Sequence, residues 1–233
     1  MKPALLDKQA GLAARLSHAC ILREIHTLSS RTFFYMNFDS PPECPVSAAQ
    51  KWFDEAVAQR ATQNPLAAAL STVDTGNRPS ARMVLLKGFD SNGAVFYTNY
   101  NSPKGIDLQA NNNASLLFYW DYCKRQLRIR GTVCKLTVEE SDAYFATRPK
   151  LNQVGTWASH QSQKLTSRTE LTAKADDLMA KWANCSVPRP EHWGGYRVSL
   201  DEMEFWHGRD GRLHDRIRYS IEDNQWTWER LQP

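Results

Sequence analysis

The sequence of 233 residues lacks the features that mark membrane, secreted and metal-binding proteins. No apolar run approaches the ~18 residues that a membrane-spanning helix needs. Charged side chains between Lys2 and Arg15 break any signal-like apolar core. The five cysteines are scattered, odd in number and without a Cys-x-x-Cys pair, so neither a disulfide framework nor a zinc site is indicated. We therefore expect a cytoplasmic protein.

Several catalytic motifs are also missing. The sequence contains no Gly-x-Gly-x-x-Gly after a strand, no phosphate-binding Gly-x-x-x-x-Gly-Lys-[Ser/Thr], no Gly-x-Ser-x-Gly and no His-Glu-x-x-His. These absences disfavour classical dinucleotide enzymes, nucleotide hydrolases, serine hydrolases and zinc proteases.

The charge balance is mildly basic. Lys and Arg number 29 against 25 Asp and Glu, a net charge of +4. This balance suits anionic ligands, but it does not indicate nucleic-acid binding without a basic patch. The length and the 42% apolar share predict one compact domain over residues 47–233, preceded by a lead-in segment over 1–46 with a helix near 8–28.

Hydrophobic periodicity predicts short strands and a few helices. Residues 47–62 have the apolar spacing of an amphipathic helix. Ser102 and Pro103 open a second helix, and Thr137 with Glu140 forms a capping box before a third. The pattern predicts a mainly β fold with flanking helices (α+β), an antiparallel barrel or sandwich with its helices outside. The other expected segments are strands within 66–74, 78–89, 94–100, 114–120, 125–137, 194–208, 212–221 and 225–231, a loop at 148–163 and a helix at 167–183.

The segment RPSARMVLLKG, residues 78–88, places a cation at each end of an apolar run. Arg82 and Lys87 are five residues apart, so in a strand they lie about 17 Å apart and on opposite faces. A strand whose two ends both reach solvent would explain them. A strand that lies along a long ligand, or between two ligands, with an anionic group at each end is the alternative.

Two further segments carry cations that could meet an anionic ligand. Lys104 stands at a helix N-terminus, where free N–H groups make a phosphate seat plausible. In RQLRIRG, Gln126, Arg128 and Arg130 alternate along one strand face. A solvated outer face explains that strand better than single-stranded nucleic acid does, because no RNA-binding aromatic motif accompanies it.

The segment GRLHDRIRY brings Arg212, His214 and Arg216 to alternate positions, and hence to one face of an expected strand. A histidine between two arginines suits an anionic substrate, although a solvated hairpin also accounts for the cations. A metal site formed by His207, Asp210 and His214 lacks the spacing that such sites use.

Taken together, these segments resemble the pyridoxamine 5′-phosphate oxidase family of FMN enzymes. The likeness runs from about Trp52 to Pro233 and depends on the order and spacing of its motifs. They are RPSARMVLLKGFD, VFYTNYNSPKG, ASLLFYW, RQLRIRG, YFATRP, ASHQSQ, WGGYRV, EFWHG, RLHDR and ERLQP. The resemblance implies an FMN-binding split β-barrel, antiparallel and Greek-key-like, that forms a homodimer with the flavin in a cleft between subunits.

The resemblance also assigns roles to residues. The arginine matching Arg82 serves the FMN phosphate, and the lysine matching Lys87 grips the phosphate of the vitamin B6 substrate. The expected cofactor residues are Arg82, Met83, Val84, Leu85, Leu86, Lys87, Tyr97, Thr98, Lys104, Gln126, Gln161, Ser162, Trp206 and Arg216. The expected substrate residues are Lys87, Tyr144, Arg148, Asn152, Arg212 and His214. Arg212 and His214 would cover the exposed ring face and form the catalytic pair.

The chemistry that the resemblance implies is an oxidation by O2. The substrate ring stacks on the flavin, a hydride passes from the carbon bearing the amine or alcohol to flavin N5, and O2 reoxidises the flavin to give hydrogen peroxide. The product is pyridoxal 5′-phosphate. Neither nucleic acid, membrane nor metal is an expected partner.

The sequence departs from the family pattern at a few positions. Pro103 stands where arginine is usual, Asn152 replaces a serine, and His207 replaces a glutamine. Arg31 and Tyr35 are one residue too far apart to match the family's early Arg-x-x-Tyr segment. These departures leave two alternatives open: a flavin oxidase of another ring compound, like the phenazine-pathway relatives, and a non-catalytic binder of flavin or pyridoxal phosphate.

Overall fold

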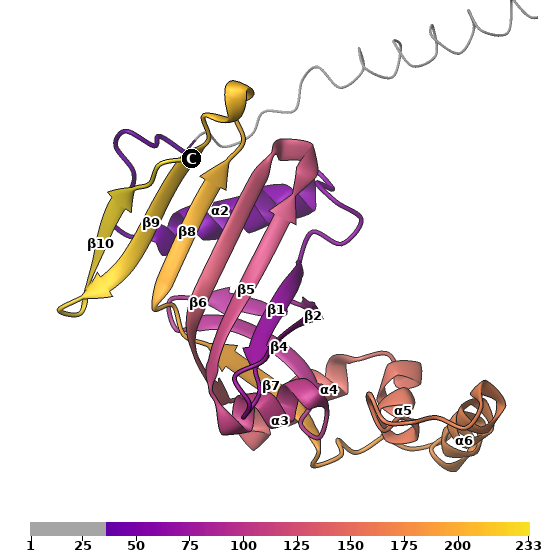
Figure 1. Ribbon diagram of the computed structural model, residues 1–233. Helices are drawn as coiled ribbons and strands as arrows, with labels where there is room; N and C mark the ends of the chain where they lie inside the picture. The colour runs from indigo at the N-terminus through magenta and orange to yellow at the C-terminus, as the bar shows by residue number, and fades with distance from the viewer. Residues whose placement is uncertain (1–35) are drawn as a thin grey trace, which may run out of the picture. The chain divides into compact units, whose positions relative to one another are not determined.

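The structure is a computed structural model and describes residues 36–233 (Figure 1). The chain divides into two units, residues 1–35 and 36–233, of which the second is described. The helix expected near 8–28, together with Arg31 and Tyr35, lies outside the described residues. Within 36–233, no helix is both long enough and apolar enough to cross a membrane.

The described residues form antiparallel strands with helices packed around them, which confirms the expected mainly β class. The helices are α2 (Pro45–Ala58), α3 (Pro103–Ala110), α4 (Val138–Thr147), α5 (Lys150–Ala158) and α6 (Arg168–Lys181). The strands are β1 (Ala67–Val73), β2 (Pro79–Leu85), β3 (Gly88–Asp90), β4 (Gly93–Asn99), β5 (Asn113–Trp120), β6 (Arg125–Lys135), β7 (Trp193–Val198), β8 (Glu202–His207), β9 (Asp215–Glu222) and β10 (Gln225–Arg230).

A circuit of hydrogen-bonded neighbours closes part of the sheet into a barrel. Strand β1 pairs with β2 and β5, β5 with β6, β6 with β7, β7 with β4, and β4 with β3. The chain itself completes the circuit, because β3 follows β2 after only Leu86 and Lys87. The backbone N–H groups of these two residues donate to Leu66 O and Val95 O, at 2.8 Å each.

Strand β6 belongs to two sheets, which gives the barrel its split. Its first half pairs with β8, which continues into β9 and β10, while its last residues pair with β7 (Figure 1). Gly131 lies at the change of partner, where an added Cβ would stand 2.0 Å from Ser199 O. Only glycine allows the segment after β7 to cross β6 this closely.

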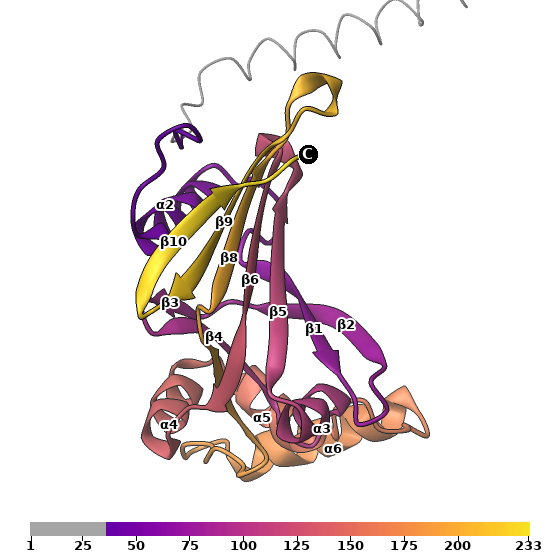
Figure 2. The same ribbon diagram turned by 60° about the vertical axis from the view of Figure 1, so that its left-hand side comes forward.

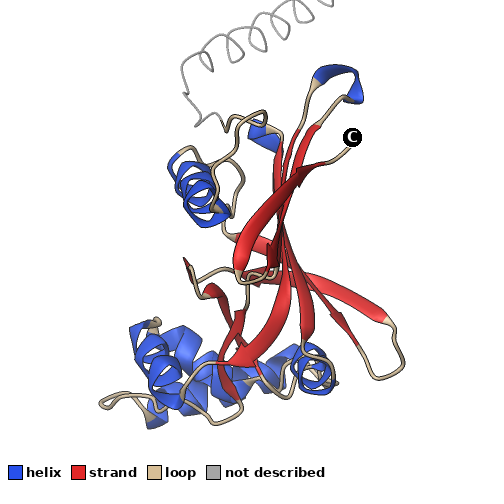
Figure 3. Cartoon of the chain, turned by 90° about the vertical axis from the view of Figure 1, so that its left-hand side faces the viewer, coloured by secondary structure: helices blue, strands red, loops and turns tan. Residues whose placement is uncertain are grey.

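The main core lies between the sheet and α2, which covers one face of it (Figure 3). Trp52 and Phe53 of α2 are buried. Their rings meet Phe205 of β8 and Phe118 of β5 edge-on, at centroid distances of 4.9 and 4.8 Å. Edge-to-face pairs of this kind add to the free energy gained by burying aromatic area. The opposite face of these strands is therefore the one left for ligands or partners.

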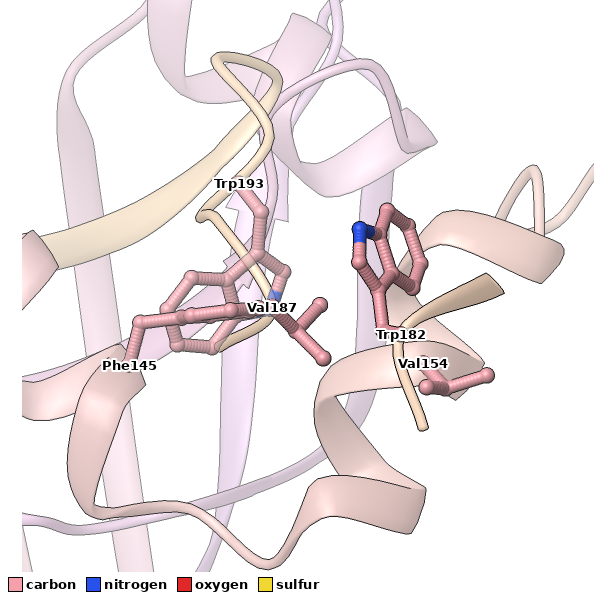
Figure 4. Packing of buried hydrophobic residues seen from close by; sticks show 5 residues of the cluster. All are labelled: Phe145, Val154, Trp182, Val187 and Trp193. Carbon is pink, nitrogen blue, oxygen red and sulfur yellow. The ribbon is translucent and has the colours of Figure 1, made fainter. Parts of the chain in front are cut away.

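A second, smaller core joins α4, α5 and α6 to the barrel. Phe145, Val154, Trp182, Val187 and Trp193 pack together in it (Figure 4). In Figure 2 the helices α3 to α6 gather at the end of the sheet away from α2. Because Trp193 opens β7, this cluster fixes the helices against the barrel wall.

The helix starts were predicted well. The capping box is present: Thr137 Oγ1 accepts from Glu140 N, and Glu140 Oε2 accepts from Thr137 N. Ser102 is the N-cap of α3, with Pro103 first in the helix, but its hydroxyl does not cap. It donates instead to Asn99 O, 2.7 Å away.

Two segment predictions were wrong. The loop expected at 148–163 contains α5, because Val154 is fully buried in the second core and Gln153 Nε2 donates to Phe145 O at 2.9 Å. The strand expected at 78–89 ends at Leu85 and resumes at Gly88. There the backbone turns from β1 toward β4.

Candidate functional site

A cavity of about 710 Å³ lies between the barrel and the helices α3, α4 and α5. This volume is typical of small-molecule sites. Most of the residues expected to bind cofactor or substrate line it, namely Met83, Val84, Leu85, Lys87, Tyr97, Thr98, Lys104, Gln161, Tyr144, Arg148 and Asn152. The lining residues that the sequence did not single out are Asn99, Thr147, Pro149, Leu151, Gly155, Thr156, Ser159 and Trp193.

The alternation expected along β2 is confirmed. Arg82, Val84 and Leu86 turn inward and are partly or fully buried, while Met83 is 64% exposed on the other face. Lys87, five residues from Arg82, is also exposed on that outer side. The two cations therefore lie in different surroundings, Arg82 on the inner side and Lys87 on the outer side.

Arg82 does not line the cavity, and polar groups of β1, β2 and α3 hold its side chain. Its Nη1 donates to Thr72 Oγ1 at 2.6 Å, and its Nη2 donates to Ser80 Oγ at 2.9 Å. Asp107 of α3 lies 3.5 Å from Nη2 and accepts a 2.6 Å bond from the Thr72 hydroxyl. The guanidinium is thus oriented before any ligand arrives.

Lys104 stands at the N-terminal turn of α3 and is 7% exposed. Its Nζ donates to Ser102 Oγ at 3.2 Å and to Gln161 Oε1 at 3.1 Å. Burial lowers the pKa of Lys104, and the charge of Arg82 lowers it further. Two cations that destabilise one another beside a helix N-terminus fit an anion such as the phosphate of a mononucleotide.

The close approach at the start of α3 depends on Gly105. A Cβ at this position would lie 2.1 Å from Tyr100 O. The absence of a side chain lets the first turn of α3 rest against the end of β4, and this contact places Lys104 at the cavity.

Arg148 stands at the other end of the lining, where α4 gives way to α5. Its Cζ lies 4.5 Å from the centre of the Trp193 ring, and its Nη1 donates to Thr156 Oγ1 at 2.8 Å. Burial lowers the pKa of Arg148. Tyr97 and Tyr144 stack at 3.9 Å beside this group and form an aromatic wall. Lys87 borders the same cavity, so this end also gathers cations.

A second group of expected residues lies on the sheet, outside the lining of this cavity. Gln126, Trp206 and Arg216 are register partners on β6, β8 and β9. From Met83 on β2 to Glu204 on β8 the register crosses β1, β5 and β6, about 19 Å along the sheet at about 4.8 Å per strand. The cavity and this second group are therefore separated within one chain. Five expected residues belong to neither set. Arg82 and Leu86 turn inward from the lining, Ser162 adjoins Gln161, and Arg212 and His214 precede β9.

Glu204 orders the second group. This carboxylate is buried, and its Oε1 accepts from Arg216 Nε at 2.9 Å. Its Oε2 lies 2.7 Å from Arg128 Nη2. Glu202 Oε1 also accepts from Arg128 Nη2, at 3.1 Å, so the two arginines meet two carboxylates on this face of the sheet.

His214 packs on Trp206, with ring centres 4.6 Å apart. The backbone N–H of Arg209 donates to His214 Nδ1 at 3.2 Å. Because Nδ1 accepts, a neutral imidazole at this position carries its hydrogen on Nε2. The free edge of the ring is then a hydrogen-bond donor.

The expectation that Arg212 shares a strand face with Arg216 was wrong. Residues Asp210–Arg212 form a short 3₁₀ turn, and β9 begins only at Asp215. Gly211 and Arg212 both have positive φ, 66° and 62°, so strand alternation cannot extend through them. Arg212 is exposed at the tip of this turn. His207, Asp210 and His214 form no metal-ligand cluster, and no other group of three such side chains does so within residues 36–233.

Two family models match the chain. One, described as "Pyridoxamine 5'-phosphate oxidase", matches residues 53–181. The other, described as "Pyridoxine 5'-phosphate oxidase C-terminal dimerisation region", matches residues 193–233. Together they cover the barrel, the helices around the cavity and the strands of the second group.

Curated relatives and solved structures agree with these models. The pyridoxine/pyridoxamine 5′-phosphate oxidase of Rubrobacter xylanophilus is 48% identical over 189 residues, 81% of this chain and 87% of its own. That of Bordetella pertussis is 50% identical over 190 residues, 81% of this chain and 89% of its own. PhzG from Burkholderia lata, solved with tetrahydrophenazine-1-carboxylic acid, is 34% identical with a TM-score of 0.81, covering 86% of this chain and 98% of its own. An FMN-binding protein from Nostoc punctiforme shares the fold at 16% identity and a TM-score of 0.66, covering 82% of this chain and 98% of its own.

Proposed function

The chain belongs to the pyridoxamine 5′-phosphate oxidase family, a family of flavin-dependent oxidases, and we propose that it converts pyridoxamine or pyridoxine 5′-phosphate to pyridoxal 5′-phosphate with FMN and O2. One observation carries the proposal. The cavity is lined by Lys104 at α3 and by Lys87 and Arg148 beside α4 and α5. Arg82 lies outside the lining, close enough to Lys104 for its charge to lower the pKa of that lysine. Two anion seats in one cavity match a phosphorylated cofactor that meets a phosphorylated substrate.

The cofactor end is formed by β2, β4 and α3. Arg82 and Lys104 would hold the FMN phosphate, and Gln161 would be released from Lys104 to reach the ligand. The backbone of Met83, Val84, Leu85 and Leu86 would run beside the flavin ring. Bound there, FMN would supply a hydride acceptor for the substrate carbon that carries the amine or alcohol, with O2 as the final oxidant and hydrogen peroxide as its product.

The substrate end is formed by Lys87 and by α4 and α5. Arg148 offers a planar pair of N–H donors, which matches phosphate geometry better than a point charge does. Tyr144, Asn152 and Lys87 would supply further donors, and the amide of Asn152 can donate where a hydroxyl is usual. These contacts would orient the substrate ring for hydride transfer, which is the protein's main contribution to the rate.

We infer that the active site is completed by a second copy of the chain. Within one chain the second group lies about 19 Å along the sheet from Met83. We therefore infer that one flavin contacts the cavity lining of one chain and the second group of its partner. The outer sheet face exposes Met83, Leu85, Leu117 and Tyr119, an apolar surface that a homodimer would cover. In the dimer, Gln126, Ser162, Trp206 and Arg216 would complete the cofactor site, and Arg212 and His214 would cover the substrate.

The role of His214 in this arrangement follows from its hydrogen bond. Because its Nδ1 accepts from Arg209 N, the ring would present Nε2–H to the substrate as a donor. It would position the substrate ring and would not remove a proton at that nitrogen.

A second candidate is oxidation of an unphosphorylated ring compound. It is favoured by the likeness to PhzG, whose structure contains a phenazine carboxylic acid. The cluster of Lys87, Tyr144 and Arg148 argues for the phosphorylated substrate, because an unphosphorylated ring would have no use for these groups together. A non-catalytic flavin binder is the third candidate.

An aerobic assay of the purified protein separates these candidates. We expect a flavin absorption spectrum and stoichiometric peroxide release with pyridoxine or pyridoxamine 5′-phosphate. Turnover of unphosphorylated aromatic acids alone would replace the proposal with the second candidate. A yellow protein that oxidises neither class would be a binder.

A further inference from the structure

We propose that Thr156 is a positioning residue that fixes the guanidinium of Arg148 in the orientation needed for the substrate phosphate. The inference rests on the proposed function. Thr156 lies in the second turn of α5 and lines the cavity. Its Oγ1 accepts a 2.8 Å hydrogen bond from Arg148 Nη1. This is the only side-chain hydrogen bond that Arg148 makes within residues 36–233.

The hydrogen count at Thr156 defines what the hydroxyl can do. A threonine hydroxyl has one hydrogen, and here it is donated to Asn152 O at 2.9 Å. The lone pairs are therefore left for Arg148, and no hydrogen remains for a phosphate. Thr156 acts on the substrate only through the arginine.

A second contact fixes the plane of the same guanidinium. Arg148 Cζ lies 4.5 Å from the centre of the Trp193 ring and 5.4 Å from that of Phe145. Stacking restricts the plane but leaves rotation within it free. The bond to Thr156 removes that rotation and leaves Nε and Nη2 as the pair of donors that can face a phosphate.

The same hydroxyl links two residues of the proposed phosphate site. It bonds the side chain of Arg148, which directly follows α4, and the main chain of Asn152, in the first turn of α5. The two helices are joined only by Arg148 and Pro149. Thr156 therefore sets the relative position of both phosphate-binding residues across a helix boundary.

The test compares Thr156→Val with the parent enzyme, both loaded with FMN. Valine keeps the shape and removes the acceptor. We expect KM for pyridoxamine 5′-phosphate to rise about fivefold to tenfold, as for a hydrogen bond to a charged group that is replaced by solvent. We expect kcat and flavin content to change less than about twofold.

Three further variants separate positioning from structure. Thr156→Ser keeps the hydroxyl and should restore KM. Thr156→Ala should repeat the valine result, and it serves in place of valine if the latter folds poorly. Thr172→Val is the matched control, because Thr172 Oγ1 makes the same kind of bond, to Arg168 O at 3.0 Å, in the exposed helix α6.

Binding of pyridoxal 5′-phosphate, followed by its absorbance, provides a readout that needs no turnover. The Kd should rise in T156V by the same factor as KM. An equal Kd in T156V, T156A and the parent would overturn the inference, whatever the activity. If the parent oxidises neither B6 phosphate while T156V still binds pyridoxal 5′-phosphate more weakly, the proposed function fails and the role of Thr156 stands.

Discussion

Under the proposed function, Arg82 and Lys87 let one short segment serve two ligands. Strand alternation puts the first inside, against Thr72 and Asp107, and the second outside at the far part of the cavity lining. The spacing of five residues matters because an even spacing would place both cations on one face. The residues around each cation then determine which phosphate it would bind, that of the cofactor or that of the substrate.

Replacing Arg82 by alanine should weaken the cofactor end. We expect the Kd for FMN to rise about 10- to 100-fold, because a charge-assisted contact to phosphate is lost. KM for the B6 phosphate should stay within about twofold once FMN is saturating. Fluorescence titration with FMN measures the first quantity, and an unchanged Kd would refute the assignment of Arg82.

Replacing Arg148 by alanine should give the opposite pattern. KM for the phosphorylated substrate should rise about 10- to 100-fold, while the purified variant keeps its flavin. Steady-state kinetics with pyridoxine 5′-phosphate provides the check. Loss of flavin in place of substrate affinity would show that Arg148 belongs to the cofactor end.

His207 makes the stability of the fold depend on pH. Burial, then the charges of Arg209 and Arg125, lowers the pKa of His207 to about 4, from an ordinary value of 6.5. The unfolded chain therefore takes up a proton between these two values while the folded chain does not, so the free energy of unfolding falls as the pH falls through this window. Stability from this source is complete above pH 6.5.

The substitution His207→Gln should remove this dependence. Between pH 7 and pH 5 the variant should lose about 1 kcal/mol less unfolding free energy than the parent, a figure reduced for the solvent that reaches the ring. Urea denaturation at the two pH values provides the measurement. Parallel losses in both proteins would mean that His207 does not titrate in this range.

At the scale of elements, the sequence predicted those helices that begin with a local capping motif, but not the helix that depends on tertiary packing. The capping box of Thr137 and Glu140 is a local device and was found. Helix α5 was missed, because no side chain caps its N-terminus and it begins directly after Pro149. Its stability comes from Val154 and from the bond of Gln153 to Phe145 O, and neither contact can be read from the sequence.

Gly131 is the element-scale feature with the clearest energetic consequence. Gly131→Ala should lower the free energy of unfolding by roughly 2–4 kcal/mol, because its Cβ would meet the main-chain oxygen of Ser199, which cannot move without breaking β6 from its neighbours. Gly155→Ala in α5 is the control, with nothing within 4 Å of its added Cβ. The free energy of unfolding of the Gly155→Ala variant should rise by less than about 1 kcal/mol. Equal effects of the two substitutions in thermal unfolding would contradict this account.

At the scale of the molecule, the family resemblance predicted a set of site residues but not their division into two groups. Position along the chain does not show that Trp206 and Arg216 lie several strands away from Met83. The register of the sheet makes that separation visible. Under the proposed function, this separation makes a homodimer necessary for a complete site.

A subunit-mixing experiment tests this requirement. At an FMN concentration too low to load either variant, Arg82→Ala and Arg216→Ala chains should regain activity when they are unfolded together and refolded. If each site uses Arg82 from one chain and Arg216 from the other, a mixed dimer has one intact site. Random pairing then gives about a quarter of the parent activity, since half of the dimers are mixed and half of their sites are intact. No recovery in mixed dimers isolated by two affinity tags would place both arginines in one chain's site.

The attachment of α4 and α5 has a consequence for how such a protein can diverge. These helices and the turn between them carry Tyr144, Arg148 and Asn152. They join the barrel mainly through one small apolar cluster, whereas β6 is hydrogen-bonded into both sheets. Mutations on the cavity side of these helices leave the hydrogen bonds between strands intact, so they lower the free energy of unfolding only slightly. A descendant protein could therefore change its substrate through substitutions in α4 and α5 alone, while the residues proposed to bind the flavin stay the same.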